Sequence, residues 1–218
     1  MRLEFSDEKF PGILISFCGL DGAGKTTQIE ILRNHIINDG YDAPFCTFQP
    51  TKEMRQNFLF RKFVDGEKSD YEAYEYRSLN LLTVSDRLQH SRHVILPQLL
   101  DGKTVISDRY FYTALINLRA RGYKQDRWIY EIAKYIPKPD LTFFINVDFD
   151  EAVRRVRSRE EEKNRYIDME FHKKLWEEYL YISQNTECIV LDNKLSIEEM
   201  ATVVYEKFLK VIAKKGGR

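Results

Sequence analysis

The segment FCGLDGAGKTTQ, residues 17–28, carries three glycines, a lysine and two threonines within twelve residues. The apolar run ILISF at residues 13–17 leads into it, which is typical of a strand buried on both faces of a parallel sheet. The loop is followed by apolar residues at helical spacing, Ile29, Leu32, Ile36 and Ile37. Gly40 then marks the expected end of the helix. The pattern predicts a strand, a glycine-rich loop and a helix over residues 26–38.

This loop matches the spacing GxxxxGK followed by Ser or Thr at Gly19, Gly24, Lys25 and Thr26. Glycines let backbone N–H groups converge on phosphate oxygens, and the following helix adds the positive end of its dipole. Lys25 can supply a charge to the outer phosphates, and the Thr26 hydroxyl can ligate Mg²⁺. A glycine-rich turn with a chance lysine is the alternative, and the strand and helix on either side argue against it.

Further short strands are expected along the chain, at residues 43–48, 104–107, 141–147 and 188–191. Helical segments separate them, including a largely helical stretch at residues 71–100 with a break near Pro97 and a last helix from near Ser196. Such alternation requires parallel pairing with right-handed crossovers. We therefore predict an α/β protein with the three-layer P-loop NTPase fold, in which five buried parallel strands lie between helices and ligands bind at their carboxyl ends.

Composition limits the range of functions. The 218 residues suit one domain spanning 1–218, and 34 Lys and Arg residues balance 34 Asp and Glu residues. Because no basic field surrounds the chain, we expect neither nucleic acid nor a membrane as partner. Cys18, Cys46 and Cys188 lack the spacing of a zinc site or a disulfide framework. With no apolar segment of membrane or signal-peptide type, we expect a soluble cytoplasmic protein.

The tetrapeptide SDRY, residues 107–110, ends the expected strand at residues 104–107 and so lies in the same crevice as the loop. Asp108 can orient Mg²⁺ and Arg109 can grip a phosphate with two parallel hydrogen bonds; a strand-terminal ion pair is the alternative. Arg87 lies in a predicted helix among apolar neighbours, and taken by itself such an arginine more often forms a structural ion pair than binds a ligand. His90 and His93 are three residues apart, but without a third ligand we expect two solvated or hydrogen-bonded side chains rather than a metal site.

Four segments together carry a resemblance: ISFCGLDGAGKTTQ, SDRLQH, GKTVISDRY and PDLTFFINVD, in this order. They are similar to the thymidylate kinase family of nucleoside monophosphate kinases, over nearly the whole chain. The resemblance implies transfer of the ATP γ-phosphoryl group to a nucleoside monophosphate, with Mg²⁺, in a homodimer. It also implies roles: Arg109 holds the acceptor phosphate, Asp108 serves Mg²⁺, Arg87 faces the acceptor base, Asp21 faces the acceptor sugar or phosphate, and Gly22, Ala23, Gly24, Lys25, Thr26 and Thr27 cradle the donor.

The charged run RSREEEKNR, residues 157–165, resembles the mobile lid of that family, at about residues 157–166. Because the phosphate loop contains no arginine, the charge that develops on the transferred group needs a cation from elsewhere. Arg157, Arg159 and Arg165 are the candidates. The alternative for such a run is a solvated face.

The chain also departs from the family. Gln49 stands where an acidic residue usually precedes the proline after the second strand, and it is a candidate contact of the acceptor. A nucleoside kinase uses a carboxylate near this place to deprotonate a neutral hydroxyl, and Gln49 cannot act as a base. A monophosphate acceptor is already anionic near neutrality, so the glutamine disfavours a nucleoside kinase more than a monophosphate kinase.

Thr83 occupies the position of a phenylalanine that stacks on thymine in the family. On the DRY helix, Thr113, Ala114 and Leu118 occupy positions that face the base, so Tyr71, Tyr74 or Phe111 would have to provide the stacking surface. We expect a dTMP kinase. The alternatives are a deoxynucleoside or other small-molecule kinase, and a catalytically silent nucleotide-binding relative.

Overall fold

The computed structural model describes residues 2–65, 75–160 and 167–216. Within these residues one parallel sheet runs in the order β2-β3-β1-β4-β5. Its strands are β1 (Ile13–Cys18), β2 (Phe45–Phe48), β3 (Thr104–Asp108), β4 (Leu141–Asn146) and β5 (Ile189–Asp192). The predicted α/β class and five-stranded parallel sheet are confirmed.

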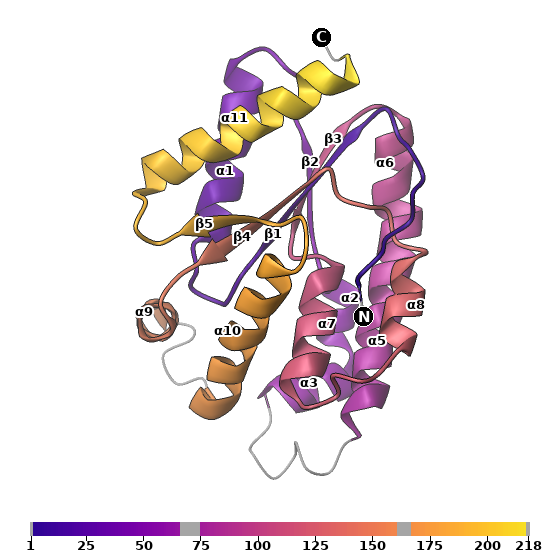
Figure 1. Cartoon of the computed structure of the whole chain (residues 1–218), viewed down its shortest axis with the longest axis vertical. Coiled ribbons are helices and arrows are strands. Elements are labelled where there is room, and N and C mark those ends of the chain that lie inside the picture. Colours follow the sequence, from indigo (N-terminus) through magenta and orange to yellow (C-terminus); the bar gives the residue numbers. More distant parts are fainter. Residues whose placement is uncertain (1, 66–74, 161–166, 217–218) are drawn as a thin grey trace.

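Helices cover both faces of the sheet (Figure 1). On one side α1 (Lys25–Asn38) packs against α11 (Ile197–Lys215). On the other side lie α5 (Tyr76–His90), α6 (Leu96–Leu100), α7 (Phe111–Ala120) and α10 (Met169–Gln184). The remaining described α-helices are α2 (Lys52–Gln56), α3 (Phe58–Asp65), α8 (Trp128–Ala133) and α9 (Phe149–Arg157). None of the described helices is both long and apolar enough to cross a membrane.

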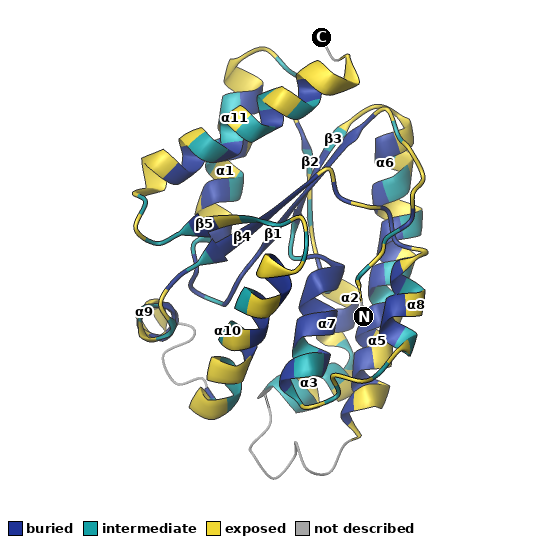
Figure 2. Cartoon of the chain, viewed as in Figure 1, coloured by how far each residue is buried: buried dark blue, intermediate teal, exposed yellow. Residues whose placement is uncertain are grey.

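The strands differ in burial (Figure 2). All six residues of the central strand β1 are buried, as the apolar run predicted. The edge strands β2 and β5 are only partly buried, so the expectation of five fully buried strands is wrong for these two. Each edge strand lacks a neighbour on one side, which leaves part of its surface to solvent.

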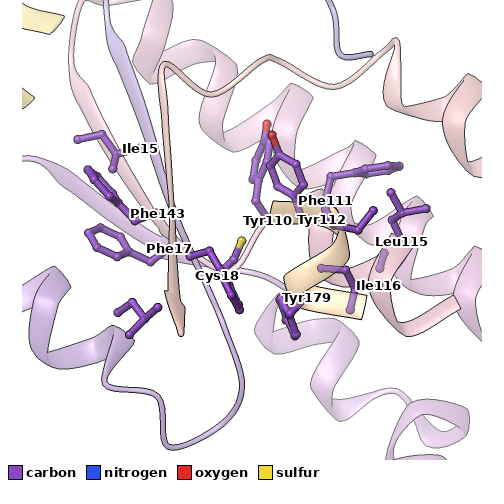
Figure 3. Close-up of a cluster of buried hydrophobic side chains, with 14 of the residues drawn as sticks. Ile15, Phe17, Cys18, Tyr110, Phe111, Tyr112, Leu115, Ile116, Phe143 and Tyr179 are labelled. Atoms are coloured by element: carbon purple, nitrogen blue, oxygen red, sulfur yellow. The ribbon is translucent and has the colours of Figure 1, made fainter. Parts of the chain in front are cut away.

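A buried aromatic cluster joins the sheet to the start of α7 (Figure 3). Phe17 of β1 stacks on Phe143 of β4, with ring centroids 5.2 Å apart. Tyr110 and Phe111 are fully buried, and the Tyr110 hydroxyl donates to the Pro137 carbonyl at 2.9 Å. This packing fixes where α7 begins. As a result α7 leaves the sheet beside the carboxyl end of β1.

The long helical segment is irregular near Pro97, as predicted, and the irregularity is a π-helical turn. A π-helical turn at Ser91–Ile95 separates α5 from α6, and Pro97 lies in the first turn of α6. A proline is tolerated there because its missing N–H would have had no intrahelical partner. The break therefore precedes Pro97 and does not occur at it.

Candidate active site

The phosphate loop curls between β1 and α1 with several glycines at positive φ. Gly24, with φ of 97°, is the N-cap of α1, so the loop ends directly on a helix N-terminus. At Gly22, with φ of 81°, an added Cβ would lie 2.4 Å from the Ala152 carbonyl oxygen of α9. The close approach of α9 therefore requires a glycine at residue 22.

Lys25 is buried beneath this loop, with 6% of its surface exposed. Its ammonium donates to the carbonyl oxygens of Leu20 at 2.8 Å and Gly19 at 3.2 Å. Burial, with a contribution from the nearby charge of Arg109, lowers the pKa of Lys25 to about 8. A phosphate group beside the ammonium would favour the charged form, so the site suits an anion.

Arg109 lies at the carboxyl end of β3, held by a backbone hydrogen bond from its N–H to the Phe17 carbonyl at 2.8 Å. Its backbone has φ of 64°, which is unusual for a residue with a side chain. Its guanidinium donates to Asp21 at 2.5 Å, to the Gly19 carbonyl at 3.0 Å and to the Tyr179 hydroxyl at 3.3 Å. Burial alone would lower the pKa of Arg109, but Asp21, Tyr179 and Asp108 outweigh it and raise the pKa.

Asp108 precedes Arg109, and its Oδ1 is buried without a hydrogen-bond partner among the described residues. The Thr26 side chain is exposed at the start of α1. No cluster of three or more His, Cys, Asp or Glu side chains suited to a metal occurs in the described part of the chain. A carboxylate and a hydroxyl nevertheless fit Mg²⁺, which commonly takes one or two protein oxygens and completes its shell with water and substrate phosphates.

A single cavity of about 1100 Å³ brings these groups together. It is lined by most of the residues that the sequence predicted, namely Asp21, Gly22, Gly24, Lys25, Thr26, Thr27, Arg87, Asp108, Arg109, Thr113 and Arg159. Gly19 and Ala23 belong to the loop but do not line the cavity. Segments that lie far apart in the sequence thus face one another across a common space.

Arg87 does not form the structural ion pair that was one of its two interpretations. It is 3% exposed, and its Nη1 donates to the backbone carbonyl of Thr83 at 2.8 Å, without an ion pair among the described residues. Burial lowers the pKa of Arg87 to about 10. An unpaired buried guanidinium in a cavity wall favours a ligand that can accept its hydrogen bonds.

Three predicted positions lie elsewhere. Gln49 is fully buried outside the cavity lining, and its Nε2 lies 3.2 Å from His90 Nδ1 and 3.3 Å from the Ser91 hydroxyl. His90 Nε2 also forms a hydrogen bond with the Thr47 hydroxyl at 2.9 Å. Leu118 and Phe111 are fully buried in the core, so neither faces a base. Tyr71 and Tyr74 lie outside the described residues.

The lid arginines differ in position. Arg157 is the last residue of α9 and is exposed, without lining the cavity. Arg159 is exposed and lines the cavity. Arg165 lies outside the described residues. Among the described candidates, Arg159 is therefore the one that lines the cavity.

Sequence analysis missed several residues of the cavity wall, which are Arg55, Arg61, Asn80, Asn117, Arg121, Phe63, Tyr76 and Phe171. The Arg121 guanidinium lies over the rings of Phe171, Phe63 and Tyr76, at 4.0, 4.5 and 4.5 Å from their centroids. Three aromatic side chains from three helices thus line the far end of the cavity. One signal was available, because residues 113, 117 and 121 recur at the four-residue interval of one helix face.

Comparison with known proteins agrees with this geometry. The thymidylate kinase family model matches residues 17–204. The chain belongs to the thymidylate kinase family. It is 37% identical to a probable thymidylate kinase of Pyrococcus horikoshii over 153 residues, which cover 68% of this chain and 71% of the relative. It is also 32% identical to a probable thymidylate kinase of Pyrococcus abyssi over 87% of this chain and 92% of the relative.

A bacterial member of the family is similar along almost its entire length. The thymidylate kinase of Caldanaerobacter subterraneus is 30% identical over 207 residues, covering 91% of this chain and 97% of the relative. The region that matches the thymidylate kinase family model includes the phosphate loop, the DRY segment and both described arginines of the lid region.

Proposed function

We propose that this protein transfers the γ-phosphoryl group of ATP to dTMP, giving ADP and dTDP. The observation that carries the proposal is the shared cavity, in which the phosphate loop and Arg109 face a slot between α5 and α7. The similarity to thymidylate kinases supports the choice of thymidylate as acceptor.

The charge of the cavity suits two phosphorylated ligands. Among the described residues its wall holds two carboxylates, Asp21 and Asp108, and seven cationic side chains, which are Lys25, Arg55, Arg61, Arg87, Arg109, Arg121 and Arg159. Phosphoryl transfer depends mainly on positioning and on stabilising charge on the transferred group. A surplus of cationic side chains around one shared cavity supplies both.

On the donor side, the loop N–H groups and Lys25 would hold the phosphates of ATP, with Thr27 at the start of α1. Thr26 and Asp108 would hold Mg²⁺, which supplies charge neutralisation between the phosphates. The exposed Thr26 hydroxyl and the unpaired Asp108 Oδ1 support this assignment.

On the acceptor side, Arg109 would bind the acceptor phosphate, with Arg55 of α2 as a second cation in the same wall. The bond between Arg109 and Asp21 ties this group to the phosphate loop, which would hold the attacking oxygen near the donor. Arg87 and Thr113 line the slot further along. Arg159, with Arg157 and Arg165, would contribute charge from the lid at residues 157–166.

A deoxynucleoside kinase is disfavoured by the position of residue 49. Such an enzyme needs a general base at the acceptor hydroxyl, and Gln49 has neither the chemistry nor a place in the cavity wall. A catalytically silent relative is disfavoured by the retention of Lys25, Asp108 and Arg109 together. A monophosphate acceptor needs no base from residue 49.

The assembly and setting of the enzyme belong to the same proposal. We place the whole chain in one catalytic domain and in the cytoplasm, where its three free cysteines would stay reduced. We expect a homodimer that pairs the outward faces of α5 and α6, where Leu81, Leu82 and Leu100 are 46%, 37% and 61% exposed. Light scattering after size exclusion tests the dimer, and Leu82→Asp should shift it to monomer.

A coupled assay of ADP release tests the proposed activity, with dTMP, dUMP, dCMP, dGMP, dAMP and thymidine as acceptors. We expect dTMP-dependent turnover and none with thymidine. Silence with every monophosphate, or turnover with thymidine alone, would overturn the proposal.

A further inference from the structure

The segment ahead of β1, residues 2–12, runs beside α6 (Figure 1), where the Gly12 N–H donates to the Leu99 carbonyl at 2.9 Å. We call it the leading segment. It precedes residues 17–204, which match the family model, so its role has to be read from its contacts. Two of its phenylalanines, Phe5 and Phe10, are partly buried and pack against the core.

Phe5 contacts the aromatic residues at the start of α7. Its ring centroid lies 6.2 Å from that of Tyr110, 6.1 Å from that of Phe111 and 5.2 Å from that of Tyr112. The contacts with Phe111 and Tyr112 are edge-to-face, an arrangement that aromatic pairs prefer. Tyr110 is fully buried and follows Arg109 directly in the chain. The ring of Phe5 therefore helps to fix the residue next to Arg109.

The leading segment also holds Tyr110 through the loop before β4. The Ser6 N–H donates to the Ile136 carbonyl at 2.9 Å, and Ser6 forms a parallel bridge with Pro137. The Pro137 carbonyl in turn accepts a hydrogen bond from the Tyr110 hydroxyl at 2.9 Å. Tyr110 is thus held at its ring by Phe5 and at its hydroxyl by a loop that Ser6 anchors.

An ion pair sets the register of the leading segment. Nη1 of Arg92 donates to the two carboxylate oxygens of Glu8 at 2.8 and 3.1 Å, and Nε of Arg92 donates to the Tyr135 carbonyl at 2.8 Å. Arg92 belongs to the π-helical turn between α5 and α6. Partly exposed ion pairs contribute little to stability. This one, together with the Ser6 bridge, brings the ring of Phe5 onto Tyr110.

Arg109 needs support of this kind because of its backbone. Its φ of 64° lies in the left-handed region, which is unfavourable for a residue with a Cβ and persists only where the surrounding contacts over-determine it. Its N–H donates to the Phe17 carbonyl at 2.8 Å, and its carbonyl accepts from the Ser107 hydroxyl at 2.6 Å. These bonds fix the two peptide groups of Arg109, and the anchored Tyr110 fixes the chain that follows them.

We propose that Phe5 is a positioning residue of the reaction, which acts through Tyr110 to keep Arg109 in the conformation that places its guanidinium in the cavity wall. This inference rests on the proposed function, in which Arg109 binds the acceptor phosphate. Phe5 does not line the cavity, so its effect reaches the reaction only through Arg109. A displacement of about 1 Å in a positioned group can cost on the order of 100-fold in rate.

Phe5→Ala tests this role, with Phe10→Ala as the matched control. Both variants remove a partly buried phenylalanine of the leading segment, and among the described ring contacts Phe10 makes none with the start of α7. We expect Phe5→Ala to lower kcat/KM for dTMP about tenfold, while the KM for ATP stays within about threefold. Phe10→Ala should change both values by less than about threefold. Thermal unfolding shows how far each variant is destabilised.

A double-mutant cycle asks whether the effect passes through Arg109. In the Arg109→Ala background, Phe5→Ala should lower kcat/KM for dTMP by less than about twofold, because the group that Phe5 positions is already absent. Hydrogen–deuterium exchange provides a measurement that is independent of activity. A peptide covering residues 107–113 should exchange faster in Phe5→Ala than in the parent, and at the parental rate in Phe10→Ala.

The outcomes separate the two proposals. If the parent phosphorylates no monophosphate, the proposed function is wrong, and exchange at residues 107–113 still decides whether Phe5 fixes the start of α7. The positioning role is wrong if Phe5→Ala leaves that exchange or kcat/KM for dTMP unchanged, or if it keeps its full effect in the Arg109→Ala background. Should Phe5→Ala lack cooperative thermal unfolding, Phe5→Leu replaces it, because leucine keeps apolar bulk and removes the ring.

Discussion

The two ends of the cavity are built in different ways. The donor end consists of one continuous loop, in which backbone N–H groups, glycines at positive φ and a helix N-terminus form the surface. The acceptor slot consists of side chains from α5 and α7, with α3 and α10 closing its far end. A backbone-built site is specified by local sequence, whereas a slot between helices is specified by their packing.

The strongest test of the donor end is Lys25→Met. Methionine keeps the length of the side chain and removes the charge, so turnover should fall by about 1000-fold through loss of charge stabilisation. Steady-state kinetics with ATP and dTMP measures this. The control is Lys134→Met, which changes an exposed lysine at the C-terminal end of α8 and should match the parent. If Lys25→Met turned over nearly as fast as the parent, Lys25 would not be the residue that stabilises the phosphates of ATP.

The same variant should change the pH dependence of stability. Burial lowers the pKa of Lys25 to about 8, below the value of 10.5 in an unfolded chain. Between these pH values only the unfolded state holds the proton, so the parent gains stability as pH rises. Relative to Lys25→Met, the gain from pH 8 to 10.5 should be on the order of 3 kcal/mol in urea titrations. If the stabilities of the parent and of Lys25→Met changed in parallel with pH, burial would not lower the pKa of Lys25.

Arg109→Ala tests the link between the two ends. Arg109 lines the acceptor side and also donates to Asp21 and to the Gly19 carbonyl of the loop. We expect kcat/KM for dTMP to fall about 100-fold, while the KM for ATP changes within about threefold. Initial rates with each substrate varied in turn measure both. Equal loss of affinity for ATP and dTMP would place Arg109 on the donor side instead.

Two glycine variants of the phosphate loop test how closely its backbone is packed. Their effects on stability are the smallest of those predicted here. Gly22→Ala would place a methyl group 2.4 Å from the Ala152 carbonyl, whereas Gly24→Ala meets no atom within 4 Å. Both positions have positive φ, so each variant should lose about 1 kcal/mol from backbone strain, and Gly22→Ala about 2 kcal/mol more from the clash. Thermal unfolding of the two proteins measures the difference. Equal losses would mean that α9 does not pack against the loop.

For this reason sequence alone predicted the strand, loop and helix that form the proposed donor end. Gly19, Gly24, Lys25 and Thr26 lie within eight residues, and a strand and a helix flank them. The five strands were likewise visible as apolar runs, and the SDRY segment was correctly placed at the end of β3. Where a function depends on consecutive residues, spacing is sufficient.

Prediction from sequence failed where tertiary packing determines which side chains line the cavity. Asn117, and not Leu118, lines the slot, because one step along α7 turns a side chain by about 100°. Gln49 follows β2 but is drawn inward by His90 and Ser91, which lie 41 and 42 residues away in the sequence. The aromatic rings around Arg121 come from three helices, and no local pattern indicates that they meet.

The most direct test of the account follows the phosphoryl group itself. The protein is incubated with ATP labelled at the γ-phosphate and with dTMP, and the nucleotides are separated, with Lys25→Met in parallel. The account predicts label in dTDP, formed with the parent and about 1000-fold slower with the variant. Label released only as inorganic phosphate, or transferred to thymidine in preference to dTMP, would contradict it.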